Sequence, residues 1–277
     1  MKKIGFIDYY LNEWHALNYP EMIASIQNEF DGEFRITHAY AEIDHPNMST
    51  DEYCKKYNVI RCSSIDEICH ECDYLILLYP DDPERKCEVI KKVISFGKPV
   101  FVDKTFVNSY EEAKEVFECA KKYNTPMFTS SSLRYSIELK ELPNDLTSLF
   151  IVAPSVHLKD YWVHPLEMLV SKMGVGAKKV KHLVSGNHHI LQIKYENKDA
   201  LIVMAEMGYA QDFFVSGNGQ NGQNLKRCTS PYFVNEMRDV LRFFKEKTPS
   251  FDYQQTLEIM RIRDLTLLEK YDEWLEL

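Results

Sequence analysis

Two segments of the chain hold the side chains best suited to proton chemistry. "FVDKTF" places Lys104 directly after a short apolar run, and "KDYWVHPLEML" places Asp160 four residues before His164. A lysine ammonium at the end of a buried strand can polarise a carbonyl or exchange a proton once burial and nearby charge tune its pKa. A histidine whose tautomer is fixed by a carboxylate is a proton donor or acceptor near neutral pH.

Both segments also have a purely structural interpretation. Lys104 can be a solvated lysine in a turn, and His164 can cap a helix while Asp160 is exposed. Pro165 suits the first turn of a helix that runs to about Met173, and it disfavours helical geometry at His164. We therefore expect Asp160 and His164 on the turn that leads into this helix, not one above the other on its face.

Composition excludes several classes of protein. The 277 residues are enough for two domains. A formal net charge of -9, with lysine and arginine dispersed among acids, disfavours a nucleic-acid or anionic-membrane partner. We expect no membrane span and no signal peptide, since every apolar run is too short. Seven cysteines without a framework predict a reducing cytoplasm.

The tightest cysteine pair, Cys69 and Cys72 in "CHEC", has the spacing of half a zinc site. No second pair stands at a matching distance, and a structural zinc ion needs about four ligands. We therefore expect no metal, and two buried cysteines at the end of a helix.

The elements that must position these groups follow from hydrophobic patterning. Up to residue 128 strands alternate with helices, which predicts a Rossmann-like parallel sheet covered on both faces. The expected strands are 4–8, 34–40, 74–79, 100–103 and 127–130, and the expected helices are about 14–29, 50–57, 64–70, 83–96 and 109–123. Beyond residue 130 the strand patterns at about 148–157, 178–185, 189–196, 199–206 and 212–216 predict a mostly antiparallel sheet. Two helices, 231–247 and 253–275, close the chain.

The fold class is therefore α/β, with a first domain over 1–128 and a second, α+β domain over 129–277. Ligands of open parallel sheets bind beyond the carboxyl ends of the strands. The residues at those ends are Asp8, Tyr9 and Tyr10 after the first strand, Tyr79 and Pro80 after the third, Asp103 before Lys104, and Ser130 to Arg134. Arg134 and its neighbouring hydroxyls can bind a polar or anionic substrate, or serve only in a turn.

Taken in order, these segments resemble the Gfo/Idh/MocA family of oxidoreductases. The likeness rests on Tyr79-Pro80, on Gly97-Lys98-Pro99-Val100 leading into Asp103-Lys104-Thr105, and on "KDYWVHPLEML", which is similar to the family's Asp-x-x-x-His segment. It extends to the closing helices and so spans nearly the whole chain.

The resemblance implies a Rossmann domain followed by a domain whose open antiparallel sheet often mediates oligomers. It implies hydride transfer between NAD or NADP and a hydroxyl carbon of a sugar or cyclitol. Lys104 would position substrate and cofactor, His164 would act as acid or base, and Asp160 would support it. Arg134 and Tyr161 would contact the substrate. The cofactor would be lined by Asp8, Tyr9, Tyr10, Tyr79, Pro80 and Asp103.

The chain departs from the family where the cofactor should bind. The turn after the first strand should carry G-x-G-x-x-G, whose glycines admit the pyrophosphate. Here it reads "DYYLNEW", and the one nearby glycine, Gly5, falls inside the strand. Asp8 adds negative charge near the expected pyrophosphate, and Thr105 replaces a family proline. Glu42 and Asp44, after the second strand, could meet an adenosine ribose.

Two functions of different classes follow. The first is a cytoplasmic, homo-oligomeric NAD(P)-dependent oxidoreductase acting on a small sugar-like or polyol substrate, which the retained Lys104, Asp160 and His164 favour. The second is a cofactor-free ligand-binding or regulatory protein on the same fold, which the missing glycines favour. A helix N-terminus can hold phosphate without the full glycine pattern, so the first function is the leading hypothesis.

Overall fold

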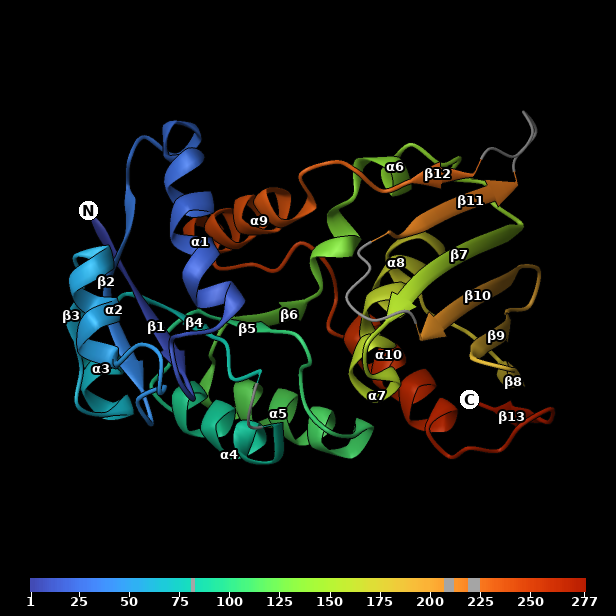
Figure 1. Ribbon diagram of the computed structural model, residues 1–277, viewed down its shortest axis with the longest axis horizontal. Helices are drawn as coiled ribbons and strands as arrows, with labels where there is room; N and C mark the ends of the chain where they lie inside the picture. Colours follow the sequence, from blue (N-terminus) through green and yellow to red (C-terminus); the bar gives the residue numbers. More distant parts are fainter. Residues whose placement is uncertain (81–82, 207–211, 219–224) are drawn as a thin grey trace. The chain divides into compact units, whose positions relative to one another are not determined.

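The computed structural model describes residues 1–80, 83–206, 212–218 and 225–277 (Figure 1). The chain forms two compact units, one of residues 1–130 with 236–251 and one of residues 131–235 with 252–277. Segment 236–251 therefore belongs to the first unit. The predicted division, with one boundary after residue 128, assigns this segment to the second domain. No helix in the described ranges is long and apolar enough to cross a membrane.

Unit 1 is built on a parallel sheet with strand order β3-β2-β1-β4-β5-β6. The strands are β1 (Lys2–Asp8), β2 (Phe34–Ala41), β3 (Ile60–Arg61), β4 (Tyr74–Leu77), β5 (Val100–Asp103) and β6 (Met127–Ser130). The order reverses between β1 and β4, which is the switch point where doubly wound folds bind ligands. The Rossmann-like prediction is confirmed; only β3, two exposed residues without an apolar signal, was not expected.

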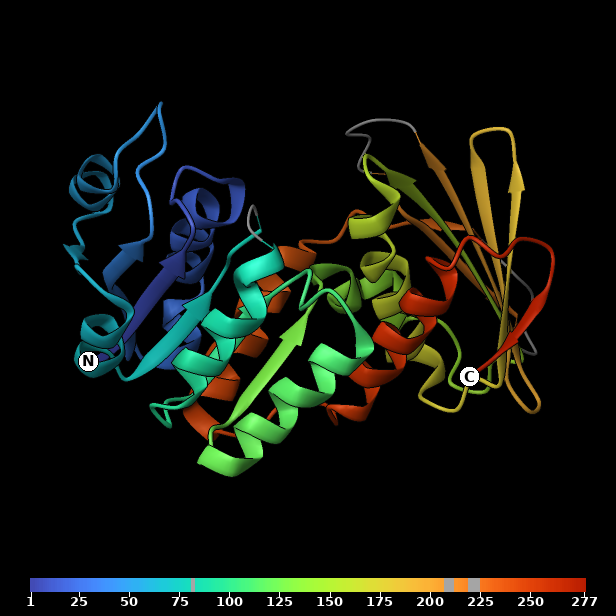
Figure 2. The ribbon, with the colours of Figure 1, turned by 90° about the horizontal axis from the view of Figure 1, so that it is seen from below.

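The helices of unit 1 cover both faces of this sheet. They are α1 (Trp14–Ser25), η1 (Gln27–Phe30), α2 (Thr50–Tyr57), α3 (Ile65–Glu71), α4 (Pro83–Ile94), α5 (Tyr110–Tyr123) and α9 (Tyr232–Glu246). α1 and α9 lie on one face, and α4 and α5 on the other (Figures 1 and 2). Phe244 of α9 stacks on Tyr74 of β4 with 4.8 Å between ring centroids, so a late helix completes the core of this unit.

Gly5 lies inside β1, as expected, and its role is close packing. A Cβ added there would lie 2.8 Å from Cγ1 of Ile68 and 2.9 Å from Sγ of Cys72. The glycine thus lets α3 approach the sheet closely, and Cys69 and Cys72 are buried beside it. This glycine cannot replace those of a phosphate-binding turn.

Unit 2 contains a seven-stranded sheet with the order β12-β11-β7-β10-β9-β8-β13. The strands are β7 (Ser148–Ser155), β8 (Lys179–Ser185), β9 (His188–Lys194), β10 (Asp199–Glu206), β11 (Phe214–Asn218), β12 (Lys226–Arg227) and β13 (Trp274–Glu276). Among the described strands only β7 and β10 pair in parallel, so the mostly antiparallel prediction is confirmed.

Helices of unit 2 pack on one face of this sheet. They are η2 (Ser132–Tyr135), α6 (Ile137–Lys140), α7 (Leu158–Tyr161), α8 (Val163–Met173) and α10 (Gln254–Thr266). The prediction of one helix over 253–275 is wrong at its end, since α10 stops at Thr266 and residues 274–276 form β13. Pairing of β13 with the edge of β8 satisfies backbone groups that a longer helix would leave exposed there.

The geometry expected at His164 is also wrong. His164 is the second residue of α8, and Trp162 in helical conformation joins α8 to α7. The N–H that Pro165 lacks falls in the first turn, where the helix needs no donor, so His164 can remain helical. The expected end of the helix, Met173 followed by Gly174 at a positive φ of 75°, is confirmed.

A proline inside α1 explains a contact between α1 and α2. Pro20 has no N–H to donate to the carbonyl of Ala16, four residues earlier. The hydroxyl of the fully buried Tyr53 on α2 donates to that carbonyl at 2.7 Å. Tyr57 donates at 2.7 Å to the carbonyl of Leu17, which the helix itself can satisfy.

We therefore expect Tyr53→Phe to lower the free energy of unfolding by about 1–3 kcal/mol, because a buried carbonyl loses its donor. The matched variant Tyr57→Phe should cost clearly less. Urea unfolding followed by circular dichroism measures both. Equal costs for the two variants would contradict this explanation of the proline in α1.

Candidate functional site

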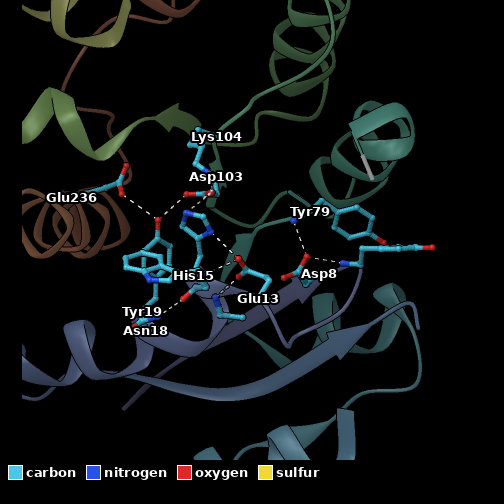
Figure 3. Close-up of polar contacts among 12 residues, drawn as sticks. Asp8, Glu13, His15, Asn18, Tyr19, Tyr79, Asp103, Lys104 and Glu236 are labelled. Atoms are coloured by element: carbon cyan, nitrogen blue, oxygen red, sulfur yellow. Dashed lines mark hydrogen bonds and ion pairs between the residues drawn. The ribbon is translucent and has the colours of Figure 1, made fainter. Parts of the chain in front are cut away.

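The carboxyl end of β5 presents Asp103 and Lys104 (Figure 3). Asp103 is 1% exposed, and its Oδ1 accepts a hydrogen bond from Tyr19 at 2.8 Å. Its Oδ2 lies 3.9 Å from Nζ of Lys104 and 3.8 Å from Nε2 of His15. The Lys104 side chain is 21% exposed, so a buried acid holds a lysine that solvent can still reach.

The charge on Asp103 depends on its neighbours. Burial by itself raises the pKa of this carboxyl, but the fields of His15, Lys104 and Lys86 and the Tyr19 hydrogen bond outweigh burial, and the net pKa lies below the ordinary value. Asp103 is therefore an anion at neutral pH, which gives Lys104 a fixed counter-charge.

Tyr19 connects Asp103 to a second buried acid. Its hydroxyl lies 3.2 Å from Oε2 of Glu236 on α9, and Oε1 of Glu236 accepts from the Ser130 hydroxyl at 3.0 Å. Burial, followed by the charges of Asp103 and Glu236, raises the pKa of Tyr19 well above its usual range. Tyr19 therefore stays a phenol that donates to these carboxyls, and it joins α1, β5 and α9.

A lysine from α4 is buried beneath this end of the sheet. Lys86 is 1% exposed, and its Nζ donates to the carbonyl of Asp103 at 2.8 Å and lies 3.5 Å from that of Lys104. Lys104 is itself joined to Thr105 by a cis peptide bond. Burial lowers the pKa of Lys86 from 10.5 to about 7, although the charges of Asp103 and Asp8 oppose this. Lys86 thus fixes the backbone that carries Lys104.

At the switch point, the N-terminus of α1 already holds an acid of the chain. The Glu13 carboxylate accepts the backbone N–H of His15 at 2.8 Å and that of Ala16, and it also lies 2.8 Å from Nδ1 of His15. Behind it, Asp8 is fully buried, and its Oδ1 accepts the N–H groups of Tyr9 at 2.7 Å and Tyr79 at 2.9 Å. These contacts are drawn in Figure 3.

Burial, and next the nearby charge of Glu13, raise the pKa of Asp8 well above its ordinary value. Its Oδ2 accepts no hydrogen bond from the part of the chain that the structure describes. Tyr9 and Tyr10 are half-buried above it with 5.7 Å between ring centroids, and Pro80 is likewise half-buried. Asp8 and the fully buried Tyr79 thus support the turn from below and do not line an open surface.

The acids after β2 are engaged within the chain as well. The hydroxyl of Tyr79 donates to Oε2 of Glu42 at 2.6 Å, and Arg85 pairs with Oε1 of Glu42 at 2.5 Å. Asp44 accepts the N–H of Thr50 at 2.8 Å at the start of α2. The carboxylates that could bind an adenosine ribose therefore have internal partners.

In unit 2, the His164 imidazole forms a hydrogen bond with a serine hydroxyl. Nδ1 of His164 lies 2.6 Å from Oγ of Ser131, and the ring of Tyr161 packs on its edge at 5.1 Å. Asp160 is exposed on α7. Ser131 is thus a partner for the imidazole that the sequence did not indicate.

Arg134 is part of a buried ion pair. Its Nε lies 2.5 Å from Oε2 of Glu167, and its Nη1 donates to Gln255 at 2.7 Å. Arg134 and Glu167 are 7% and 2% exposed. This arrangement favours a structural role for Arg134, and its contact with a substrate stays a prediction.

The sequence did not indicate several side chains of this site. Lys86 stands four residues before Ile90 and seven before Val93, on the apolar face of α4, and Glu236 stands four residues before Val240 on that of α9. A charged residue in an apolar stripe is the signal that could have found both. Among the described residues no cluster of three or more His, Cys, Asp or Glu side chains could hold a metal ion.

Comparison with known proteins gives a family match over part of the chain. Residues 19–130 match the Gfo/Idh/MocA model, described as an oxidoreductase family with an NAD-binding Rossmann fold. An uncharacterized oxidoreductase of Schizosaccharomyces pombe is 31% identical over 64 residues, which is 23% of this chain and 17% of the yeast protein. The chain thus spans under a fifth of that relative.

Solved structures share the fold over the whole chain. A UDP-N-acetylglucosamine 3-dehydrogenase from Acidithiobacillus ferrooxidans has a TM-score of 0.79 at 12% identity, covering 96% of this chain and 97% of the other. A putative myo-inositol dehydrogenase from Sinorhizobium meliloti has a TM-score of 0.78 at 11% identity, covering 100% and 99%. The resemblance to the Gfo/Idh/MocA family is confirmed, with the family model matching residues 19–130.

The family match begins at residue 19 and so omits the turn after β1. At that turn the chain does not fit a dinucleotide pyrophosphate, because Glu13 takes the N–H groups of α1 and Asp8 lies behind it. The carboxyl end of β5, with Asp103 and Lys104, keeps the groups that the family resemblance implies.

The depressed pKa of Lys86 predicts a pH dependence of stability. Between pH 7 and 10.5 the unfolded chain keeps a proton that native Lys86 releases, so this group makes the free energy of unfolding rise with pH. The difference between wild type and Lys86→Met should grow by about 1–2 kcal/mol from pH 7 to 8.5. Urea titrations at three pH values measure it, with Lys121→Met, an exposed lysine, as control. Parallel pH curves for wild type and Lys86→Met would contradict the shift.

Proposed function

We propose that the chain is an NAD(P)-dependent oxidoreductase that transfers a hydride to or from a hydroxyl-bearing carbon of a sugar-like or polyol substrate. The observation that carries this proposal is Lys104, held at the carboxyl end of β5 beside the buried, anionic Asp103 and above Lys86. The family description and the sugar and cyclitol names of the similar dehydrogenases support the reaction class and the substrate class.

The roles of this chain's residues follow from their surroundings. The Lys104 side chain would position substrate and cofactor, since the Asp103 carboxylate, 3.9 Å from its Nζ, fixes its direction. His164 would act as acid or base through Nε2 while Ser131 orients the ring at Nδ1. Asp160, on the preceding helical turn, would support His164, and Tyr161 would contact the substrate.

A second candidate is a cofactor-free ligand-binding or regulatory protein on the same fold. The specific observation in its favour is the internal engagement of Glu13 and Glu42, which removes phosphate and ribose contacts of a dinucleotide. Calorimetric titration of the folded protein with NAD⁺, NADH, NADP⁺ and NADPH separates the two. Saturable binding of one dinucleotide supports the oxidoreductase, and no binding of any supports the second candidate.

For the oxidoreductase, we expect Lys104→Met and His164→Ala each to lower kcat/KM by about 100-fold or more, the usual size of an acid–base contribution. Initial rates of dinucleotide reduction with a panel of sugars and polyols give the measurement. Lys121→Met and His188→Ala, at exposed positions, are matched controls. Full turnover by either site variant would remove that residue from the proposed site.

A homo-oligomer through the C-terminal sheet is a further part of the proposal. One sheet face of unit 2 is covered by α8 and α10, and no helix in the described part of this unit covers the other (Figure 2). Half-buried apolar side chains line that open face: Phe150, Val152, Leu183, Ile190, Leu201 and Val203. Such a face is suited to a second copy of the chain.

We expect the wild type to sediment as an oligomer and Val203→Lys to sediment as a monomer, because a charge at the centre of the face opposes burial. Analytical ultracentrifugation measures this, and Lys121→Met should behave as the wild type. A wild type that sediments as a monomer at a protein concentration of roughly tens of micromolar would contradict the prediction.

A further inference from the structure

The N-terminus of α1 is where a fold of this topology offers backbone donors to an anion. It follows β1 at the switch point of the sheet, and a helix N-terminus carries partial positive charge and unpaired N–H groups. In this chain those donors have a partner. Glu13, whose backbone is extended at φ -128° and ψ 165°, folds its carboxylate back onto the N–H groups of His15 and Ala16.

The imidazole of His15 strengthens this arrangement. Its Nδ1 lies 2.8 Å from the same Glu13 oxygen that accepts the His15 N–H, and its Nε2 faces Asp103 at 3.8 Å. The Glu13 carboxylate is therefore held by three groups from two residues of the helix. Such a carboxylate satisfies the same donors that a phosphate oxygen would.

A second acid lies behind the first. Asp8 is 0% exposed, and its Oδ2 has no hydrogen-bond donor within the described ranges. The chain thus gathers two carboxyl groups at one helix terminus, and a pyrophosphate placed there would bring its negative charge next to the Glu13 carboxylate. Like charges in a water-poor site repel strongly.

From these contacts we propose that Glu13 is a built-in occupant of the α1 anion position, which keeps the phosphates of a dinucleotide away from this helix. Glu13 would fill the position in an oxidoreductase and in a cofactor-free protein alike. In the oxidoreductase it keeps the cofactor phosphates off these helix donors and so lowers the affinity for the cofactor, and the donors become available to phosphates when Glu13 is replaced.

The test compares wild type with Glu13→Ser and Glu13→Gln. Serine caps a helix with a short hydroxyl and clears the space, whereas glutamine keeps the size and removes only the charge. Glu21→Gln removes the same charge from an exposed position of the same helix and is the matched control. Calorimetry with NAD⁺, NADH and inorganic pyrophosphate gives the dissociation constants, and thermal melts establish that each variant is folded.

We expect Glu13→Ser to bind NAD⁺ and pyrophosphate at least tenfold more tightly than wild type, Glu13→Gln to gain less, and Glu21→Gln to gain nothing. No gain in either Glu13 variant, or an equal gain in Glu21→Gln, would overturn the proposal. Because wild type is measured too, micromolar binding of pyrophosphate by the unaltered chain would also overturn it, whether or not a variant fails to fold.

The outcomes of this binding test can be distinguished from those of the activity test of the proposed function. Tighter binding by Glu13→Ser without turnover of any sugar or polyol supports the role of Glu13 and removes the oxidoreductase. If the wild type turns over a sugar or polyol and both Glu13 variants keep its dinucleotide affinity, the oxidoreductase is supported and the role of Glu13 is overturned.

Discussion

The buried carboxylate of Asp103 is the constraint on which unit 1 depends. An anion that is 1% exposed must be surrounded by donors and positive charge. Tyr19 from α1 supplies a hydroxyl, Lys86 from α4 donates to the adjoining backbone carbonyl, and Lys104 supplies positive charge. One side chain at the end of β5 thus fixes two helices and the proposed catalytic lysine.

A related constraint shapes the switch point, where the chain supplies its own acceptors for backbone N–H groups. Asp8 ties the ends of β1 and β4 together through two backbone N–H groups, and Glu13 satisfies the first turn of α1. Dinucleotide-binding Rossmann folds leave such donors to a ligand, with glycines in the turn. The turn is therefore stable without a ligand. This explains how the chain keeps a Rossmann-like fold although its first turn lacks the glycines of the dinucleotide-binding pattern.

The sequence predicts the strands and helices that have a strong hydrophobic period, such as β5 and β6, whose limits it places correctly. It fails where tertiary contacts decide. Residues 274–276 pair with β8 in spite of a helical pattern, and His164 stays helical because Pro165 falls in a first turn. The roles of Glu13 and Lys86 depend on side-chain direction at a helix end and on burial, and no residue type alone reveals them.

The most direct measurement is a crystal structure of the protein grown with a saturating concentration of NADH. The account predicts that the Glu13 carboxylate remains on the N–H groups of His15 and Ala16 and that no phosphate density lies within hydrogen-bond distance of them. A pyrophosphate bound to the N–H of Ala16, with Glu13 turned away in the wild type, would contradict the account.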